Sequence, residues 1–309
     1  MPLSVHNVHI AATTMRNQLR LGTRGSALAL AQSRWVAGQL ETLGASVLLE
    51  VIRTTGDQLA DVSLGTIGGT GVFVSEIQNA LLEGRIDLAV HSMKDVPGGM
   101  PDGLTIAAVP PREDPRDVLV GRTAGTLAAL PRRAVVGTSS PRRRAQLLAA
   151  RPDLEVADLR GNLDTRLRKL DEGQYDAICL AAAGLHRLGL GQRITEYLEP
   201  DAMVPAAGQG ALAIQVRTGE LAIVSALNHD GSALAVCAER AVLAGLGGGC
   251  AVPLGVLCTV DGNLLTVRAA LCSPDGKTVI RDQIVREGRP EDLGREMADR
   301  LRSRGAGIL

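Results

Sequence analysis

Alternation between two hydrophobic periods is the feature that most constrains this 309-residue chain. From residue 19 onward, short apolar runs typical of buried strands alternate with segments of helical periodicity that end at glycines. Such alternation predicts parallel sheets built from strand–helix–strand units. It occurs on both sides of residues 110–117, a segment with three prolines and five charged residues that we interpret as a hinge.

The same pattern predicts the individual elements of the two α/β stretches. In the first helix, capped by Ser26, roughly one face carries Leu28, Ala31, Trp35, Leu40 and Leu43 and is expected to be buried. Strands are expected at residues 19–23, 47–52, 86–90, 104–109, 134–137, 154–159 and 177–180, and further helices at 73–82, 141–150 and 164–170. The glycine-rich residues 54–71 are expected to form a long loop.

Residues 230–309 follow a different pattern. A helix at 232–244 is followed by a glycine-rich stretch and by three strand-like runs, which the hairpin signals DGN and PDGK separate. A last helix is expected to begin near Pro290. These signals predict a small C-terminal α+β domain with an antiparallel sheet.

Charge and composition argue against several classes of function. Lys plus Arg and Asp plus Glu are both 33 and aromatic residues are 1%, whereas binders of nucleic acid or anionic membranes show a basic excess. Five cysteines without a CxxC pattern disfavour a metal site and a disulfide scaffold. No signal peptide or membrane-spanning run is recognisable. We therefore expect a cytoplasmic protein with neither nucleic acid nor a membrane as partner.

The helix predicted at 141–150 has cations at the end where a helix disfavours them. Ser140 suits the N-cap and Pro141 suits the first helical position. Arg142, Arg143 and Arg144, however, occupy the first turn, where the helix dipole is positive. A bound anion would reverse this penalty, because free N–H groups, the dipole and the arginines would all favour it.

Arginines also follow several other predicted strands. Arg24, Arg160, Arg166 and Arg187 lie at or after carboxyl ends of strands, the usual ligand edge of an α/β sheet, although single solvated arginines are the alternative. Without nucleotide-binding motifs, a polycarboxylate is as plausible a ligand as a phosphate.

Three other side chains are candidates for catalysis. Asp95 could stabilise positive charge or move a proton, or could merely cap a turn. Cys250, after three glycines, could be an accessible nucleophile or an inert thiol. His91 could be a base or a structural hydrogen-bonding residue. The remaining cysteines fall in helix or strand patterns and are expected in the core: Cys179, Cys237, Cys258 and Cys272.

Several segments, in order from residue 19 to the end, together resemble the porphobilinogen deaminase family. They include RLGTRGSALALAQ, AVHSMKDVP, REDPRDV, VGTSSPRRRAQL, LRGNLDTRL, VPAAGQGALAI and GGGCAVPLG. The resemblance implies two α/β domains like the lobes of periplasmic binding proteins, with a cleft between them, plus a small C-terminal α+β domain. The domains expected are an extension at 1–18 without fixed structure, domain 1 at 19–112 and 206–229, domain 2 at 113–205 and domain 3 at 230–309.

The resemblance also implies a reaction. A dipyrromethane cofactor, joined by a thioether to the matching Cys250, accepts four porphobilinogen molecules in turn, each losing ammonia. The linear product hydroxymethylbilane is then released, and Asp95 matches the catalytic carboxylate. The family is expected to act as a monomer without a metal.

The family's cofactor and substrate contacts match thirteen further positions. They are Arg24, Ser26, Ser92, Lys94, Thr138, Ser139, Ser140, Arg142, Arg143, Arg160, Arg166, Arg187 and Gln209. The chain departs from the family where Thr70 and Ser75 replace two lysines of the glycine-rich loop, which puts only contacts between loop and substrate in doubt. The alternative function is a non-catalytic, two-lobed protein that binds an organic polyanion.

Overall fold

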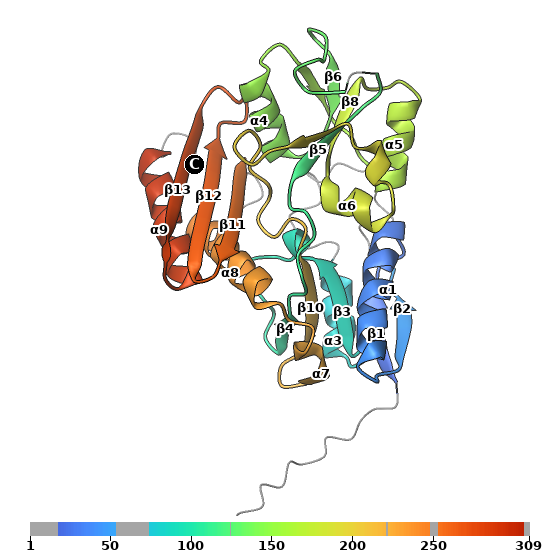
Figure 1. Cartoon of the computed structure of the whole chain (residues 1–309). Coiled ribbons are helices and arrows are strands. Elements are labelled where there is room, and N and C mark those ends of the chain that lie inside the picture. Colours follow the sequence, from blue (N-terminus) through green and yellow to red (C-terminus); the bar gives the residue numbers. More distant parts are fainter. Residues whose placement is uncertain (1–17, 54–73, 124, 221, 248–252, 306–309) are drawn as a thin grey trace, which may run out of the picture.

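The computed structural model describes residues 18–53, 74–123, 125–220, 222–247 and 253–305. In these residues the chain forms two five-stranded sheets and one three-stranded sheet, each covered by helices (Figure 1). The predicted fold class, two α/β units followed by a small α+β unit, is confirmed. No helix in the described part of the chain is long and apolar enough to cross a bilayer.

Sheet A has the strand order β2-β1-β3-β10-β4. Its strands are β1 (Leu19–Thr23), β2 (Val47–Val51), β3 (Leu88–Ser92), β4 (Leu104–Ala108) and β10 (Leu212–Arg217). Its helices are α1 (Ala27–Thr42), α3 (Ser75–Leu82), the 3-10 turn η2 (Met93–Asp95) and α7 (Ala222–Ser225). Together they are named lobe A.

Sheet B repeats this plan in the order β7-β6-β8-β5-β9. Its strands are β5 (Asp117–Gly121), β6 (Val135–Gly137), β7 (Glu155–Ala157), β8 (Ala177–Ala181) and β9 (Glu196–Leu198). Its helices are α4 (Pro141–Ala150), α5 (Leu163–Asp171), α6 (Ala182–Arg187) and the 3-10 turn η3 (Gly191–Arg193). Together they are named lobe B.

The prediction of parallel sheets is confirmed for three strands of each lobe and is wrong for the other two. β1 pairs in parallel with β2 and β3, but β10 runs antiparallel between β3 and β4. Likewise β6 is parallel to β7 and β8, whereas β5 runs antiparallel between β8 and β9. The reason is that β5 and β10 enter their sheets directly from the two segments that cross between the lobes, not through a strand–helix–strand unit.

The buried face of α1 also differs from the prediction. Trp35 is 45% exposed, whereas Gln32, Val36, Ala37 and Leu40 are buried against sheet A. A polar side chain therefore occupies the buried stripe of this helix, which disguises the stripe in the sequence.

The two crossing segments lie side by side, one before β5 and one before β10. The backbone N–H of Glu113 donates to the carbonyl oxygen of Gly210 at 3.2 Å. Gly210 has a φ of +85°, and a Cβ there would collide with the carbonyl oxygen of Glu113. Glycine is therefore needed where the crossing segments meet.

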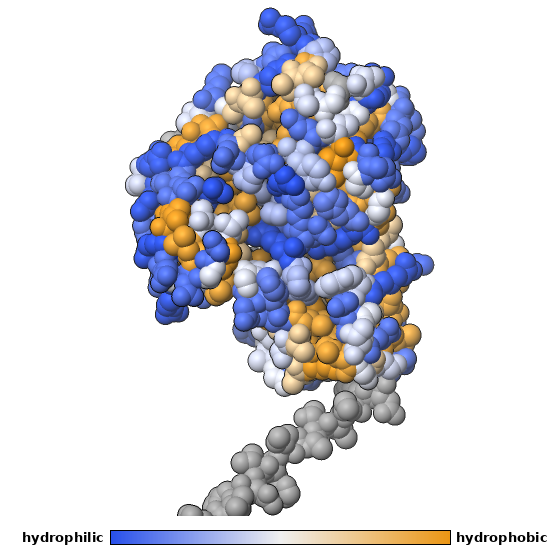
Figure 2. All heavy atoms as spheres, in the orientation of Figure 1, coloured by the Kyte–Doolittle hydropathy of each residue, from blue (hydrophilic) through white to orange (hydrophobic). Residues whose placement is uncertain are grey.

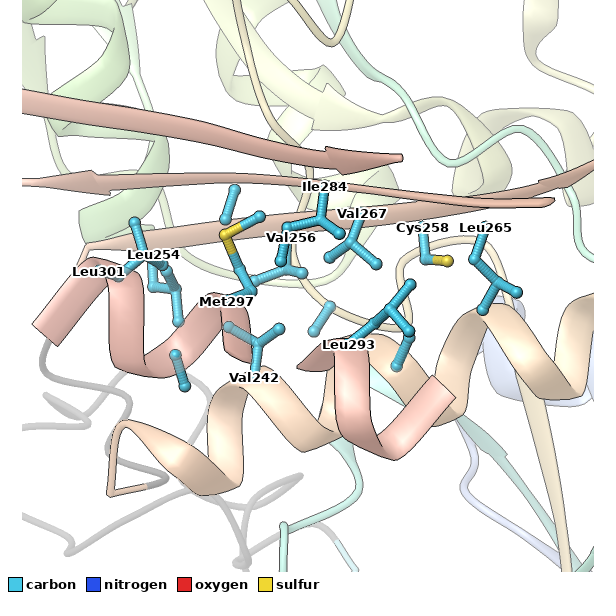
Figure 3. Packing of buried hydrophobic residues seen from close by; sticks show 14 of the residues in the cluster. Val242, Leu254, Val256, Cys258, Leu265, Val267, Ile284, Leu293, Met297 and Leu301 are labelled. Carbon is cyan, nitrogen blue, oxygen red and sulfur yellow. The ribbon is translucent and has the colours of Figure 1, made fainter. Parts of the chain in front are cut away.

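Lobe C packs an antiparallel sheet, in the order β11-β12-β13, against two helices. It comprises α8 (Asp230–Gly245), β11 (Leu254–Asp261), β12 (Leu264–Cys272), β13 (Val279–Glu287) and α9 (Pro290–Arg304). Its core interleaves Val242 of α8 with Val256 and Val267 of the sheet and with Leu293 and Met297 of α9 (Figure 3). The strands predicted at the hairpin signals are confirmed.

A buried ion pair fastens lobe C to both crossing segments. Glu239 of α8 is fully buried and accepts from the guanidinium of Arg112 at 2.6 Å. The same carboxylate accepts from the backbone N–H of Gly208 at 2.6 Å and of Cys258 at 2.8 Å. One carboxylate thus joins the first crossing segment, the second crossing segment and β11.

Candidate active site

A cleft of about 210 Å³ lies between lobe A and lobe B. Arg24 follows β1, Ser92 ends β3 and Ala181 ends β8, and all three residues line the cleft. This is the edge outside the carboxyl ends of the parallel strands, where α/β sheets bind ligands. Figure 2 shows hydrophilic side chains across the middle of the visible face, between the two lobes. The cleft is therefore the candidate active site.

Lobe A contributes a hydrogen-bonded pair and a short turn that carries two charges. Ser26 caps α1 as predicted, and one turn later the buried Gln32 donates from Nε2 to the Oγ of Ser92 at 2.9 Å. Directly after β3, the 3-10 turn η2 places Lys94 and Asp95 in the cleft, where both side chains are exposed to solvent. The end of a strand thus presents an amine and a carboxylate side by side.

Charges from both lobes act on one another across the cleft. The pKa of Lys94 is lowered to about 8, first because the cleft walls desolvate the ammonium and then because Arg143 repels it. Since Lys94 keeps an accessible surface, this desolvation comes from the surrounding walls rather than from burial in a core. Desolvation and Arg143 also lower the pKa of Arg166 to about 10. Asp95 opposes both shifts, so its carboxylate lies among these cations.

Lobe B contributes arginines that are held by backbone carbonyl groups. Arg166 of α5 donates from Nε to the carbonyl oxygen of Gly161 at 2.8 Å. Arg187, at the end of α6, donates to the carbonyl oxygen of Gly210 at 2.6 Å, and desolvation lowers its pKa. Both arginines line the cleft together with Arg143. The carbonyl groups that hold Arg166 and Arg187 are neutral, so these hydrogen bonds fix the two guanidinium groups without neutralising their charge, as an anion site requires.

The protein itself supplies part of the negative charge that the arginines in the first turn of α4 require. Arg142 donates to Oδ2 of Asp117 at 2.5 Å and to the carbonyl oxygen of Val204 at 2.8 Å. Arg143 donates from Nε to Oδ1 of Asp117 at 2.8 Å. Burial opposes the charge of Asp117, but the two guanidinium groups outweigh it and hold the pKa of this carboxyl well below its ordinary value.

Gln209, on the second crossing segment, joins the two walls. Its Nε2 donates to the carbonyl oxygen of Pro115 at 2.8 Å and to Oδ1 of Asp117 at 2.9 Å. Its Oε1 accepts from Lys94 of lobe A at 3.3 Å and from Arg143 of lobe B at 3.4 Å. One fully buried amide therefore touches cations of both lobes.

The structure brings together nine of the residues singled out from the sequence, which are His91 and eight residues of the expected site. The cleft is lined by Arg24, Ser26, Ser92, Lys94, Asp95, Arg143, Arg166 and Arg187. Six others do not line it, namely Thr138, Ser139, Ser140, Arg142, Arg160 and Gln209. Cys250, Thr70, residues 1–17 and the whole loop expected at 54–71 lie outside the described residues, and Ser75 begins α3.

The side chains of residues 138–140 build the turn before α4. Thr138 accepts from the backbone N–H of Ser140 at 3.2 Å. Ser139 exchanges two hydrogen bonds of 3.0 Å with the backbone of Leu159. Ser140 caps α4 by accepting from the N–H of Arg143. In this structure these hydroxyl groups serve the backbone, which places the arginines of α4.

The contacts of His91 favour a structural hydrogen-bonding role over a role as a catalytic base. It is buried, and its Nε2 lies 3.0 Å from Oε1 of Gln215. Desolvation lowers its pKa to about 4, with Arg24 adding to the effect and Gln215 opposing it. A neutral ring at pH 7 donates to Gln215 and holds β3 to β10 at the wall of the cleft, which His91 helps to line.

Four cleft-related polar residues were missed by sequence reasoning. Gln32, Asn162 and Asp164 line the cleft, and Asp117 lies behind Arg143. Gln32 had a signal, because it interrupts the apolar stripe of α1 one turn after Leu28. Asp117 had a weaker one, as an acid immediately before the apolar run of β5.

The described cysteines are free thiols held in their protonated form. Cys179, Cys258 and Cys272 are buried as predicted, and Cys237 is half-buried. Desolvation raises the pKa of Cys179 to about 12 and that of Cys237 to about 11. Across the described part of the chain, no three His, Cys, Asp or Glu side chains are grouped as a metal site would need.

Family models match almost the whole chain. Residues 19–225 match the model described as "Porphobilinogen deaminase, dipyromethane cofactor binding domain", and residues 233–303 match "Porphobilinogen deaminase, C-terminal domain". A protein named porphobilinogen deaminase from Syntrophotalea carbinolica is 50% identical over 294 residues, which cover 93% of this chain and 93% of that protein. Another of that name from Roseiflexus castenholzii is 48% identical over 300 residues, covering 96% of this chain and 99% of that protein.

Similarity to solved structures is weaker. A periplasmic substrate-binding protein of an ABC transporter from Coxiella burnetii aligns with a TM-score of 0.42 and 15% identity over 68% of this chain and 89% of that one. A lipoprotein of the YaeC family from Enterococcus faecalis aligns with a TM-score of 0.39 and 14% identity over the same shares. TM-scores this low carry no argument about fold or function.

Proposed function

Since the chain belongs to the porphobilinogen deaminase family, and is therefore an enzyme of tetrapyrrole biosynthesis, we propose that the cleft between lobes A and B is its active site. The enzyme condenses four porphobilinogen molecules head to tail, with loss of one ammonia each, and releases hydroxymethylbilane when water breaks the bond to the cofactor and supplies the hydroxyl group. The observation that carries the proposal is the placement of Asp95 among cationic side chains from both lobes. These cations are Arg24, Lys94, Arg143, Arg166 and Arg187.

The chemistry of the substrate explains why a carboxylate is needed there. In each addition the bond between the aminomethyl carbon and its nitrogen breaks, and ammonia leaves with the electron pair. The carbon then bonds to a pyrrole α-carbon, which loses its proton. As ammonia leaves, positive charge develops on the pyrrole ring of the substrate. Asp95 accepts the hydrogen bond of the pyrrole N–H, stabilises this charge and helps to move the proton.

The residues present fit a dipyrromethane group and its growing product. Each porphobilinogen unit carries an acetate and a propionate, so linked units form a polyanion. Arginine guanidinium groups match carboxylates in a two-bond geometry, and Lys94 adds a point charge. When bound, the dipyrromethane supplies the pyrrole carbon to which the first substrate is joined. Arg143, Arg166 and Arg187 would hold carboxylates from the lobe B side, and Arg24 from the lobe A side.

Cys250 is proposed as the covalent anchor, because it occupies the family's cysteine position in the sequence after α8. The six predicted contacts that do not line the cleft remain proposed contacts of cofactor and substrate, and five of them are proposed to shape the cleft wall as well. Gln209 and Arg142 hold charged neighbours, and residues 138–140 set the start of α4.

We also propose that the enzyme works as a monomer in the cytoplasm. One chain supplies both walls of the cleft, so no second copy is needed to complete the site. The domain limits proposed are those expected from the sequence, with residues 19–112 and 206–229, 113–205 and 230–309 as the folding units. Size-exclusion chromatography with light scattering tests the monomer, and a dimer mass would contradict it.

The mass of the intact protein under denaturing conditions tests the proposed function. The purified chain should exceed its calculated mass by two linked pyrrole units, and incubation with porphobilinogen should add further units. Cys250→Ala should lack the excess, whereas Cys237→Ala, which removes a half-buried thiol of lobe C, should retain it. A covalent excess in Cys250→Ala would exclude that residue as the anchor. A chain that gains no mass with porphobilinogen would overturn the proposal for the cleft.

A further inference from the structure

One buried carboxylate holds three side chains behind the cleft wall of lobe B. Asp117 has no exposed surface and does not itself line the cleft. Its Oδ1 accepts from Nε of Arg143 at 2.8 Å and from Nε2 of Gln209 at 2.9 Å. Its Oδ2 accepts from Arg142 at 2.5 Å. Asp117 therefore contacts the one cleft-lining arginine of α4 and the amide that joins the two walls.

The antiparallel direction of β5 explains how this acid reaches the cleft edge. Asp117 opens β5 and pairs with Ala181, the last residue of β8. Since Ala181 lines the cleft, the start of β5 lies where the parallel strands end. The first residue of a parallel strand would lie at the opposite edge of the sheet.

Lobe A contains a carboxylate of the same chemistry at that opposite edge. Asp87 is 1% exposed and precedes the parallel strand β3. It accepts from Arg20 at 2.9 Å and lies 3.5 Å from a guanidinium nitrogen of Arg217. None of these three residues lines the cleft. The chain therefore offers a matched control, a buried aspartate between two arginines far from the substrate.

We propose that Asp117 is a positioning residue, which orients Arg143, directly and through Gln209, toward the carboxylates of substrate and cofactor; this inference rests on the proposed function of the cleft. The guanidinium of Arg143 donates to Asp117, to the carbonyl oxygen of Cys179 at 3.1 Å and to Gln209 at 3.4 Å. Three contacts in one plane fix the orientation of the group. Nη2 contacts both Gln209 and Asp117, whereas Nη1 donates one N–H to Cys179 and carries a second N–H that can donate to a ligand.

Asp117 also sets the charge of this wall. One carboxylate between two guanidinium groups compensates one positive charge and leaves the other for an anion. Without it, Arg142 and Arg143 would be two buried like charges that repel each other and move Arg143 from its place. The loss should therefore weaken substrate binding, although it makes the wall more positive.

Asp117→Asn compared with Asp87→Asn tests the inference. Both variants should lower the melting temperature, because each removes a buried carboxylate from two arginines. Only Asp117→Asn should raise KM for porphobilinogen, by about ten-fold or more, with a smaller change in kcat. Fewer of its purified chains should carry the two-pyrrole mass. A change in melting temperature alone, as in Asp87→Asn, would overturn the inference.

A double-mutant cycle identifies the residue through which Asp117 acts. If it acts through Arg143, Asp117→Asn combined with Arg143→Gln should be no worse than Arg143→Gln alone. Additive losses in kcat/KM would contradict the inference. Should Asp117→Asn not fold, Asp117→Glu keeps the charge and displaces the carboxylate; a smaller rise in KM is expected, and an unchanged KM overturns the inference. A wild-type chain that adds no pyrrole units would instead contradict the proposed function.

Discussion

Lobes A and B share one strand plan but carry different chemistry at the edge that faces the cleft. Each sheet has three parallel strands, an antiparallel strand that enters from a crossing segment, and a final edge strand. In lobe A, the 3-10 turn after β3 presents Lys94 and Asp95. In lobe B, the helices α4, α5 and α6 present arginines. Under the proposed function, the same scaffold supplies the catalytic carboxylate from lobe A and most of the carboxylate-binding arginines from lobe B. A change at Asp95 should therefore mainly affect turnover, and changes to the arginines of lobe B should mainly affect substrate affinity.

The largest effect is expected from Asp95→Asn in lobe A. The amide keeps the shape of the side chain but cannot neutralise the developing charge or accept the proton. We expect kcat to fall roughly 10²- to 10⁴-fold, with the melting temperature nearly unchanged because Asp95 is exposed. Asp158→Asn, an exposed aspartate directly after β7 that does not line the cleft, is the control. Normal turnover in Asp95→Asn would remove the distinction between the walls.

The next effect is expected from Arg143→Gln in lobe B. Loss of a charge-assisted contact to a substrate carboxylate should raise KM about ten- to hundred-fold, with a smaller change in kcat. Arg144→Gln is the control on the same helix, because Arg144 pairs with Asp158 at 3.4 Å and does not line the cleft. Steady-state kinetics with porphobilinogen measure both variants. A fall in kcat at constant KM would assign Arg143 to the reaction rather than to binding.

The smallest effect is expected on the pH dependence of KM, because it involves a lysine of lobe A and an arginine of lobe B. Lys94 of lobe A has its pKa lowered to about 8 by desolvation and by Arg143 of lobe B. Its ammonium is charged below that pH, so KM should rise several-fold as the pH increases through about 8. Lys94→Met should flatten this rise, whereas Lys169→Met, outside the cleft, should not.

The same lysine should make the folded protein more stable as the pH rises, whereas substrate affinity should fall. The folded pKa of Lys94 is below the ordinary value of 10.5, so the unfolded chain binds more protons between about 8 and 10.5. The contribution of Lys94 to the free energy of unfolding therefore increases with pH across that window. A KM that fell together with rising stability would contradict the role given to its charge.

The sequence predicted the local elements of both lobes well, because their signals are local. Ser140, Pro141 and the following periodicity define α4, and the structure begins and ends that helix where predicted. The cleft-lining arginines were also recognisable, since each follows a strand. The strands β5 and β10 were not, because their place in a sheet depends on pairing between residues far apart in the chain.

Asp117 shows where reasoning from sequence ends at the site. The arginines of α4 predict an anion, but they do not say whether the anion is a ligand or a side chain of the protein. The structure assigns part of that role to Asp117 and removes Arg142 from the cleft wall. Gln32 was missed for a related reason, because a polar residue in a buried stripe is informative only when its partner, Ser92, is known.

The central position of β5 and β10 has a mechanical consequence for an enzyme whose product lengthens step by step. A force that separates the lobes through the crossing segments pulls on these two strands, each bonded to a neighbour on both sides, and on β4 and β9, which precede them in the chain. Antiparallel hydrogen bonds lie perpendicular to their strands, so such a load shears many bonds at once instead of peeling an edge strand bond by bond. We therefore expect the two sheets to move as rigid units and the bending to occur in the paired crossing segments, where Glu113 is hydrogen-bonded to Gly210.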